Sequence, residues 1–335
     1  MAVRIQDVAR HAGVSSATVS RVLANKPHVR QALREQVLEA VDHLGYEPNR
    51  VARSLRVQRS SIIGLVISDI QNSFFNTIVR AIEDVAHQNN YAVFLCNSDE
   101  NPAKEKLYLN LLKAERVAGV ILTPTRETAS TCQSLIDAGI PVVTIDRSIS
   151  GTNVDSVKTN NSEAAKCLVD KLIERGHQRI AVILPDLNIT TGRERFEGYQ
   201  QALNQAGLKL DTELIRSGRP ITEDGYALTC DLLCLPQPPT ALFSGTKLMT
   251  LGAVRAILET NRQIPRDLEL AAFDKLDWMP CLPSMSYAEQ PTYQLGTAAT
   301  KLLLERLQKP AKSVQHAILK SDLYFSPDTS EGLKL

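Results

Sequence analysis

Hydroxyl and guanidinium side chains are concentrated in a short segment near the N-terminus, residues 15–21. Hydroxyl groups hydrogen-bond phosphate oxygens, and a guanidinium can bind the edge of a base through two parallel hydrogen bonds. The segment therefore suits a DNA-reading surface. We predict that base edges are contacted by Ser16, Ala17 and Arg21. The DNA backbone is predicted to be held by Ser15, Thr18, Ser20 and Asn25.

Two short helices joined by a tight turn would position these side chains. Apolar residues recur at helical spacing on both sides of the turn, at Ile5, Val8, Ala9 and Ala12 and then at Val19, Val22 and Leu23. Gly13 lies in the turn, where glycine adopts a positive φ at least cost, and the Ser15 hydroxyl can accept a hydrogen bond from an amide near Thr18. This pattern predicts a helix-turn-helix.

A third helix is predicted over about residues 31–44, and Gly45 is expected to end it in the left-handed conformation. Its apolar face is predicted at Leu33, Val37, Leu38 and Val41. The third helix would complete a small all-α head.

The distribution of charge supports a nucleic-acid partner for this head. Residues 1–60 carry ten Lys and Arg against five Asp and Glu, a net charge of +5. Because the whole chain of 335 residues carries +1, the remainder carries −4. A basic module on a mildly acidic body is typical of a protein that holds a polyanion at one end. The length and the 43% apolar content predict a second, larger module with its own core.

Six cysteines are scattered without a Cys-x-x-Cys pair, at Cys96, Cys132, Cys167, Cys230, Cys234 and Cys281. We expect reduced core residues, with no metal and no cofactor. The chain has no run of 18 apolar residues, and it begins with the DNA motif rather than with a signal peptide. The expectation is a soluble cytoplasmic protein without a membrane partner.

After residue 60, apolar runs alternate with amphipathic helices. The first set has strands at 62–67, 92–96, 119–122 and 142–145 and helices near 76–88, 102–114 and 129–138. The second set has strands at 180–184, 213–216, 241–243 and 270–273 and helices near 162–175, 193–206, 223–233, 248–261 and 292–307. Continuous apolar strands separated by helices predict parallel sheets covered on both faces. We therefore predict two α/β lobes, with a ligand cleft where the carboxyl ends of their strands face each other.

Aromatic, acidic and basic side chains follow the predicted strand ends, at Phe74, Phe75, Asp146, Arg147, Arg193, Arg195 and Asp274. Carboxylates and guanidiniums form paired hydrogen bonds with vicinal hydroxyls, and aromatic rings cover an apolar ring face. The set therefore suits a polyhydroxylated ligand. Taken singly, each charged residue could equally form a structural ion pair at a loop.

An enzyme is the competing class of protein. The chain contains no Gly-x-Gly-x-x-Gly after a strand, no Gly-x-x-x-x-Gly-Lys, no His-Glu-x-x-His and no Gly-x-Ser-x-Gly. Three of the six histidines lie in the first 45 residues, which leaves the cleft without an obvious general base. A transport-type binding protein would share the two lobes but would lack the basic head. We therefore predict a protein that is not an enzyme.

Several strings carry a resemblance to a known family. They include Asp7-Val8-Ala9, Ala12-Gly13-Val14-Ser15, Thr18-Val19-Ser20-Arg21-Val22-Leu23 and Leu44-Gly45-Tyr46-Glu47-Pro48-Asn49-Arg50-Val51-Ala52-Arg53-Ser54-Leu55. Through these and later matches such as Phe273-Asp274, the chain resembles the lactose/galactose repressor (LacI/GalR) family of bacterial transcription regulators over nearly its whole length. The resemblance implies a helix-turn-helix head on a two-lobed, periplasmic-binding-protein-like α/β body. It also implies a repressor that binds a palindromic operator as a homodimer and responds to a small-molecule effector.

The resemblance also implies a division into three parts: a DNA-binding domain at 1–47, a hinge helix or linker at 48–60, and an effector-binding and dimerisation domain at 61–335. Crossings between the lobes are expected near 147–160 and 275–292. Alone, the hinge segment is too short and polar for a stable helix. The resemblance implies that it pairs with its twin in the minor groove, through Asn49, Ala52, Arg53, Arg56 and a wedge at Leu55. A flexible tether is the alternative.

Asp146, Arg195 and Asp274 are the best-matched effector contacts by resemblance. The sequence departs from the family pattern in four places. Thr246-Lys247 stands where the family usually has Asn-Asp, and Asn160-Asn161 stands where it has Asp-Asn. Pro220 replaces an aromatic residue, and Arg30 replaces a residue whose hydroxyl caps a helix. Lys247, Arg193 and Arg195 would favour an anionic effector such as a sugar phosphate over a neutral sugar. Trp278 would replace the missing stacking surface. A nucleobase effector and an idle pocket remain the alternatives.

Overall fold

The computed structural model describes residues 3–23, 29–46, 60–276 and 285–327. The chain divides into two compact units, residues 1–60 and residues 61–335, and each is described by itself. Seven residues to which the sequence assigned a role lie outside the described residues: Asn25, Asn49, Ala52, Arg53, Leu55, Arg56 and Trp278. No helix in the described part of the chain is long and apolar enough to cross a membrane.

The first unit is a three-helix head with the expected helix-turn-helix. Helices α1 (Ile5–His11), α2 (Ser16–Leu23) and α3 (Gln31–His43) enclose a core centred on Val8, Val19 and Val37. Gly13 has a φ of +60° in the turn, with no atom within 4 Å of the position a Cβ would take. The amide of Thr18 donates to the Ser15 hydroxyl at 3.1 Å, so the predicted cap of the second helix is present.

The third helix shows one error in the predicted apolar face. Leu38 is 47% exposed, whereas Ala40 is buried beside Val37. Each residue turns a helix by about 100°, so the residue next to Val37 points away from the core, whereas the residue three positions on returns to it. Gly45 follows the helix with a φ of +59°. Arg30 makes no capping hydrogen bond through its side chain, as expected for a weak helix start.

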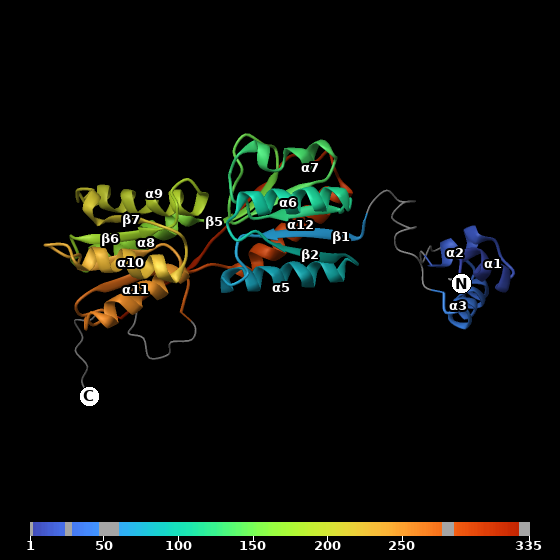
Figure 1. The fold of residues 1–335 in the computed structure, drawn as a ribbon, viewed down its shortest axis with the longest axis horizontal. Coiled ribbons are helices and arrows are strands. Elements are labelled where there is room, and N and C mark those ends of the chain that lie inside the picture. The colour runs from blue at the N-terminus through green and yellow to red at the C-terminus, as the bar shows by residue number, and fades with distance from the viewer. Residues whose placement is uncertain (1–2, 24–28, 47–59, 277–284, 328–335) are drawn as a thin grey trace, which may run out of the picture. The chain divides into compact units, whose positions relative to one another are not determined.

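The first lobe of the second unit is built on a parallel six-stranded sheet (Figure 1). Its strands are β1 (Ile62–Ile67), β2 (Ala92–Asn97), β3 (Gly119–Leu122), β4 (Val142–Ile145), β5 (Asp155–Thr159) and β11 (His316–Leu319), in the order β11-β5-β4-β3-β1-β2. Helices α5 (Ser73–Gln88) and α12 (Thr292–Gln308) share one core with the sheet. Helices α6 (Pro102–Ala114) and α7 (Gln133–Asp137), with the 3₁₀ turn η1 (Ala129–Thr131), lie on the opposite face.

Alternation along the buried strands explains these two layers. Ile63, Leu65 and Ile67 belong to the core shared with α5 and α12, while Val66 belongs to the core shared with α6. Successive side chains of a strand point to opposite faces, so a strand covered on both faces must be apolar throughout. Gly64 faces α6, where a Cβ would lie only 2.6 Å from Cδ1 of Leu112.

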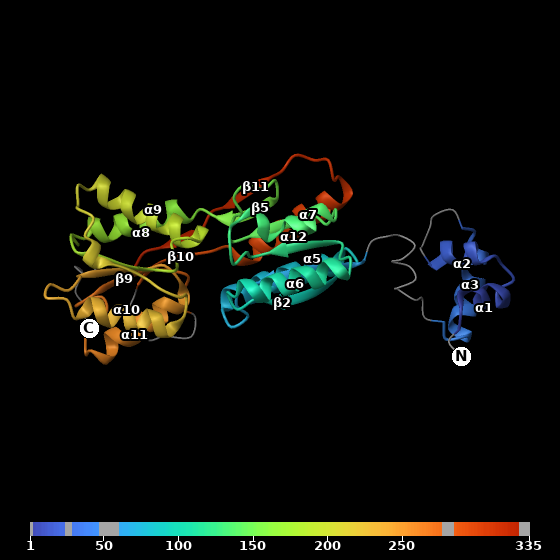
Figure 2. The same ribbon diagram turned by 45° about the horizontal axis from the view of Figure 1, so that its top comes forward.

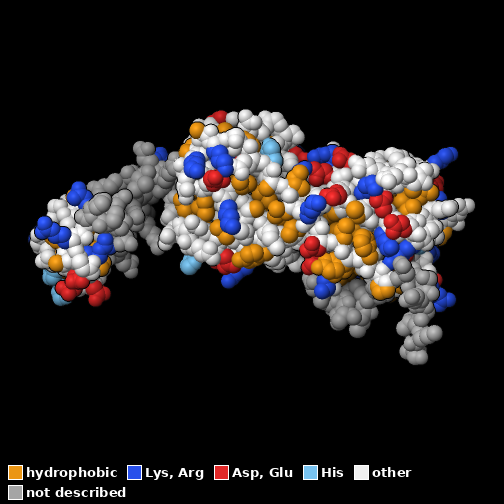
Figure 3. All heavy atoms as spheres, turned by 180° about the vertical axis from the view of Figure 1, so that it is seen from behind, with side chains coloured by type: hydrophobic (Ala, Val, Ile, Leu, Met, Phe, Trp, Pro, Cys, Tyr) orange, Lys and Arg blue, Asp and Glu red, His pale blue; other side chains and the backbone are white. Residues whose placement is uncertain are grey.

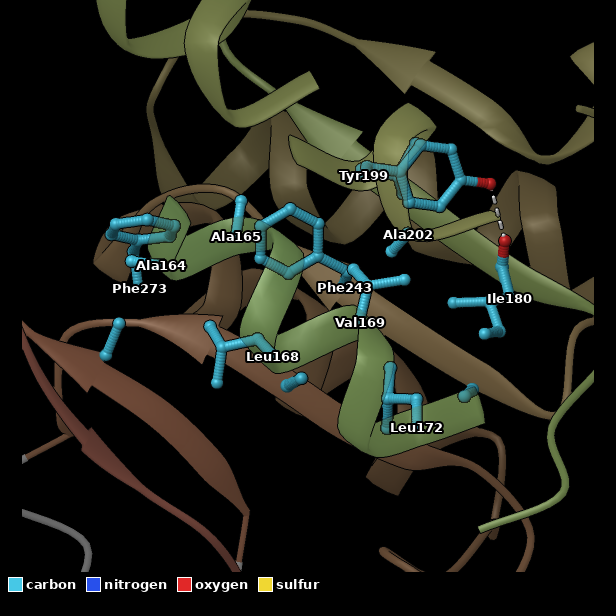
Figure 4. Packing of buried hydrophobic residues seen from close by; sticks show 14 of the residues in the cluster. Ala164, Ala165, Leu168, Val169, Leu172, Ile180, Tyr199, Ala202, Phe243 and Phe273 are labelled. Atoms are coloured by element: carbon cyan, nitrogen blue, oxygen red, sulfur yellow. Dashed lines mark hydrogen bonds between the residues drawn. The ribbon is translucent and has the colours of Figure 1, made fainter. Parts of the chain in front are cut away.

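The second lobe, whose helices lie on both sides of its sheet in Figure 2, repeats the same strand order. Its strands are β6 (Ile180–Leu184), β7 (Ile215–Ser217), β8 (Ala241–Ser244), β9 (Glu269–Phe273), β10 (Ser286–Glu289) and β12 (Asp322–Tyr324), in the order β12-β10-β9-β8-β6-β7, with β12 antiparallel. Helices α8 (Asn161–Glu174) and α9 (Thr190–Gln205) cover one face, and α10 (Thr222–Leu233) and α11 (Lys247–Glu259) the other. Figure 4 shows the core between the sheet and helices α8 and α9, where Tyr199 Oη donates to the Ile180 carbonyl at 2.8 Å.

Two predicted elements need correction. Residues 213–216 were expected as a strand, but residues 212–214 form the 3₁₀ turn η2 (Thr212–Leu214), because the Asp211 carboxylate accepts the Glu213 amide; the strand begins at Ile215. The helix at 292–307 was grouped with the second set, yet Leu295, Ala299 and Leu303 pack in the first lobe.

The described residues cross between the two sheets three times: between β5 and α8, between β10 and α12, and between β11 and β12. The first two crossings fall at the ends of the expected ranges 147–160 and 275–292, and the third was not expected. At the crossings, Asn160 Oδ1 accepts from the Ser321 amide at 2.8 Å, which ties the first crossing to the third. Both lobes therefore depend on segments from distant parts of the sequence.

Candidate functional site

The exposed face of α2 carries the side chains that the sequence assigned to base reading. Ser16, Ala17 and Arg21 are exposed, and Ser20 is half-buried. Ser15 and Thr18 are engaged with each other, since their hydroxyl oxygens lie 2.9 Å apart. On the face of the head drawn in Figure 3, Lys and Arg side chains lie apart from the Asp and Glu side chains. The exposed side of α2 thus carries small and polar side chains and one cation, Arg21, which suits insertion into a major groove.

A cleft of about 350 Å³ lies between the two lobes of the second unit. It opens at the carboxyl ends of the strands, where ligands bind in open parallel sheets. The structure places eight predicted effector contacts in its lining: Phe74, Phe75, Asp146, Arg147, Arg195, Thr246, Lys247 and Asp274. Arg193 is not in the lining, because its guanidinium turns to Glu127, with Nη2 and Oε2 3.1 Å apart.

Two aspartates occupy matching positions in the two lobes. Asp146 follows β4 and Asp274 follows β9, which are the third strands of their sheets in equivalent order. Both have left-handed backbones, with φ of +70° and +66°. Each amide donates to the neighbouring strand, Asp146 to the Val157 carbonyl at 2.9 Å and Asp274 to the Ala288 carbonyl at 2.8 Å. A short polar side chain tolerates this conformation best.

Burial dominates the electrostatics of this pair. Desolvation raises the pKa of Asp146 to about 6, although the charges of Arg147 and Arg195 oppose the shift. Desolvation also raises the pKa of Asp274, against the charge of Arg195 and hydrogen bonds from Gln290. Both carboxylates therefore lack the solvation they would have in water, and ligand hydroxyls that donate to them would replace it.

Arg195 connects the cleft to the crossings between the lobes. Its Nε donates to Asn161 Oδ1 at 2.9 Å, its Nη1 donates to the Gly245 carbonyl, and its Nη2 donates to Gln290 Oε1 at 3.1 Å. The guanidinium also stacks on Phe273, 3.7 Å from the ring centroid. Burial lowers the pKa of Arg195, although the charges of Asp146 and Asp274 oppose the shift. This side chain is fixed before any ligand arrives.

Gln290 is a lining residue that the sequence reasoning missed. Its Nε2 donates to Asp274 Oδ2 at 2.8 Å, and its Oε1 accepts from both Arg195 and the Thr159 hydroxyl. It therefore bridges the cleft to the first and second crossings. Gln290 follows β10, which reads Ser-Tyr-Ala-Glu and so has no apolar run to mark it as a strand. Recognition of that strand would have placed Gln290 at a strand end, like the other lining residues.

Arg147 offers a hydrogen-bond donor on the first-lobe side of the cleft. Its Nη1 and Nη2 form a paired contact with the Glu100 carboxylate, at 2.8 and 2.5 Å. Its Nε is buried, lacks a hydrogen-bond partner among the residues the structure describes, and lies 3.8 Å from Asp146 Oδ2. Phe74 and Phe75 add an apolar wall, with ring centroids 5.0 Å apart and planes at 86°.

The second-lobe rim carries Lys247 and Arg219. Lys247 begins α11 after Thr246, whose side chain caps the helix by accepting from the Met249 amide, and the Lys247 charge acts on Asp274. Arg219 also lines the cleft and was not predicted from the sequence. Its guanidinium donates to both carboxylate oxygens of Asp224, with Nη2 and Oδ1 2.7 Å apart. Both cations therefore already have carboxylate neighbours. No group of three or more potential metal ligands occurs in the described residues.

Comparison with protein families matches both units of the chain. Residues 4–49 match the family described as bacterial regulatory proteins, lacI family. Residues 60–326 match the family described as periplasmic binding proteins and sugar binding domain of the LacI family. The two matches together cover most of the chain, and each agrees with the fold of its unit.

Individual proteins show the same similarity. The chain is 37% identical to the ribose operon repressor of Halalkalibacterium halodurans, over 98% of this chain and 97% of that protein. The lac repressor dimer bound to operator and the anti-inducer ONPF is 28% identical, with a TM-score of 0.83, and the match covers 96% of this chain and 98% of that one. A LacI family transcriptional regulator from Enterococcus faecium with bound ribose is 27% identical, with a TM-score of 0.72, over 79% of this chain and 99% of that one.

Proposed function

Because the chain belongs to the LacI family of bacterial regulatory proteins, and is thus a DNA-binding transcriptional repressor rather than an enzyme, we propose that its effector is a neutral sugar of pentose size. The effector binds in the cleft between the lobes and changes the affinity of a homodimer for a palindromic operator. Ser16, Ala17 and Arg21 read base edges, and Ser15, Thr18 and Ser20 position the DNA backbone. The roles given to residues 48–59 stay predictions.

The charge balance of the cleft carries the choice of a neutral effector. Arg147 is paired with Glu100, Arg219 with Asp224, and the Lys247 charge acts on Asp274. Arg195 interacts with both Asp146 and Asp274. A buried phosphate would add a negative charge beside two desolvated carboxylates, and buried charges without partners are strongly unfavourable. Sugar hydroxyls can instead donate to the carboxylates and accept from guanidiniums.

The anionic effector expected from Lys247, Arg193 and Arg195 is therefore the second candidate. Arg193 lies outside the cleft lining, which removes one of the three cations behind that expectation. Two similarities support a pentose. The Enterococcus faecium regulator holds ribose, and the Halalkalibacterium halodurans relative is a ribose operon repressor.

Calorimetric titration of the full-length protein with D-ribose and D-ribose 5-phosphate tests this proposal. We expect D-ribose to bind and the phosphate to bind more weakly. Asp274→Asn should reduce D-ribose affinity roughly tenfold or more, since a hydrogen bond to a charged group contributes about 1.5–3 kcal/mol. Asp231→Asn, at an exposed position of α10 outside the cleft lining, is the matched control and should bind D-ribose as the wild type does. If D-ribose 5-phosphate binds more tightly than D-ribose and Lys247→Ala loses this advantage, the anionic effector is favoured. If neither D-ribose nor D-ribose 5-phosphate binds, the pentose is refuted.

The homodimer is supported by apolar side chains exposed on the first lobe. The edge strand β2 exposes Phe94 at 48% and Leu95 at 40%, and the next helix, α6, exposes Leu107 at 63% and Leu111 at 48%. Exposed apolar side chains on consecutive elements mark interaction surfaces, and an uncovered edge strand promotes pairing between chains. We propose that this surface, formed by Phe94, Leu107 and Leu111 on the α6 side of the sheet, is covered by the second subunit.

A further inference from the structure

Glu127 lies in the loop after β3 of the first lobe, yet its carboxylate contacts the second lobe. Oε1 accepts hydrogen bonds from both the amide and the hydroxyl of Thr190, the first residue of α9. Oε2 lies 3.1 Å from Nη2 of Arg193, one turn further along the helix. The Glu127 side chain is 7% exposed and Thr190 is 1% exposed, so the contact is largely shielded from water.

A second contact joins the lobes beside this one. The Ser148 amide, just after the cleft residues Asp146 and Arg147, donates to the Thr190 hydroxyl at 3.0 Å. The Ser150 amide donates to the Glu127 carbonyl at 3.0 Å, which ties the Glu127 backbone to the same first-lobe loop. Two loops of the first lobe thus converge on the first residue of α9.

Neither α9 nor its N-cap residue supplies a side chain that caps the N-terminus of the helix. Its N-cap residue, Ile189, has no capping side chain, and no acidic residue lies in the first turn. The first amides of a helix have no partner within the helix, and its N-terminus attracts negative charge. Glu127 supplies both an acceptor and a charge from the other lobe. The capped helix carries Thr191 and Arg195 in the cleft lining, whereas Glu127 is not in the lining.

We propose that Glu127 is a positioning residue that latches the two lobes together by capping α9. Lobes joined by a limited interface move relative to each other unless a specific contact holds them. The latch holds the wall formed by Thr191 and Arg195 at the distance from Asp146 at which one ligand reaches both. It acts on the lobes themselves, so it does not depend on which effector binds.

Hydrogen exchange of the full-length protein, read by mass spectrometry, tests this inference. In Glu127→Ala, we expect the amides of residues 190–193 to exchange about tenfold faster or more, because exchange follows local opening. The first-lobe segments 123–128 and 146–150 should also exchange faster. Glu127→Gln keeps an acceptor for Thr190 but loses the charge facing Arg193, so it should show an intermediate effect. Arg126→Ala is the matched control, because Arg126 is exposed on the same loop.

The segments that respond separate the possible outcomes. Faster exchange in α9 alone would mean that Glu127 only stabilises the helix, and the latch would be refuted. Unchanged exchange in both lobes would refute the cap as well. Thr190→Val keeps the side-chain shape but removes the hydroxyl, and it should speed exchange in residues 146–150 through the lost Ser148 contact. The buried strand β6 is the internal reference, since a general loss of stability would expose it too.

Discussion

Asp146, which we propose to bind the effector, has an unfavourable effect on stability when it is ionised. Its side chain is buried, its pKa is raised from 3.8 to about 6, and the largest cause is desolvation. A carboxyl whose pKa is higher in the folded state favours folding below the unfolded pKa, and this contribution is lost as the pH rises through the folded value. Ionised Asp146 therefore lowers the free energy of unfolding above about pH 6.

Asp146→Asn should raise the free energy of unfolding at pH 7.5 by up to about 3 kcal/mol, because the asparagine carries no charge to desolvate. Urea unfolding at pH 5 and pH 7.5 measures the difference between variant and wild type, which should be larger at the higher pH. The same variant should bind D-ribose more weakly. A variant less stable than the wild type at pH 7.5 would contradict the assigned burial effect.

Arg21 is the one cation on the exposed face of α2, within the described residues. Arg21→Ala should reduce operator affinity by about 1–3 kcal/mol and relax specificity at one position in each half-site, if the guanidinium binds a base edge. Binding to a set of single-position operator variants measures both effects. Arg10→Ala on α1 removes an exposed charge as a control and should weaken all sequences equally. An equally uniform loss for Arg21→Ala would place that residue on a phosphate.

The expectation that ligand-binding residues follow the carboxyl ends of strands predicts some residues of the cleft and not others. Asp146 and Asp274 could be located from the sequence because each follows a mainly apolar, fully buried strand. Gln290 and Arg219 follow strands that read Ser-Tyr-Ala-Glu and Ile-Arg-Ser, which have few apolar positions. Their place in the cleft depends on contacts between distant segments, which local patterns do not contain.

At the scale of elements, glycine sets how closely α8 and α9 pack. A Cβ at Gly198 of α9 would lie 2.2 Å from the Ser162 carbonyl and 2.8 Å from Cβ of Ala165, both on α8. Exchange of glycine for alanine inside a helix ordinarily stabilises it by about 0.5–1 kcal/mol. Here the backbones would have to separate, and overpacking of a core costs about 1–3 kcal/mol.

Gly198→Ala should therefore lower the free energy of unfolding, against the usual propensity. Thermal or urea unfolding of the full-length protein measures the change. Gln201→Ala, at an exposed position of the same helix, is the matched control and should be neutral or slightly stabilising. A stabilised Gly198→Ala variant would show that α8 and α9 can separate without loss of packing.

Elements differ in how well the sequence predicts them. The apolar strands β1, β3, β4 and β6 have the predicted bounds, because continuous burial leaves a continuous apolar run. The helix α6 also begins and ends as predicted. The strands β5, β10, β11 and β12 were missed. β5 reads Asp-Ser-Val-Lys-Thr, and β11 and β12 are edge strands with exposed residues, so neither an apolar run nor a strict alternation marks them.

At the scale of the whole molecule, the proposed dimer surface makes a direct prediction. Leu107→Glu should shift the protein towards monomers, because a charge buried in an apolar interface lacks a partner. Sedimentation velocity measures the change, and operator affinity should fall with it since each half-site needs a head. Leu210→Glu, which changes an apolar residue 40% exposed in the second lobe, is the control. A dimer that persists in Leu107→Glu would place the interface elsewhere.

The resemblance predicted two lobes, but the local pattern put one helix in the wrong lobe. Helix α12 follows the second set in the sequence, yet it packs against α5 because the chain returns to the first lobe after β10. The third crossing, between β11 and β12, brings the chain back once more. These returns are decided by which faces remain uncovered in three dimensions, and spacing along the sequence does not record that.

The crossings also set an order for folding during synthesis on the ribosome. The first lobe needs Leu303 of α12, which fills the space that Gly119 leaves, and it needs β11 beside β5. These segments emerge only after nearly the whole second lobe has been translated. The core of the head lies within residues 3–46. Because chains emerge from the N-terminus and domains fold as units, a nascent chain can display a folded DNA-reading surface long before it has a complete cleft to regulate it.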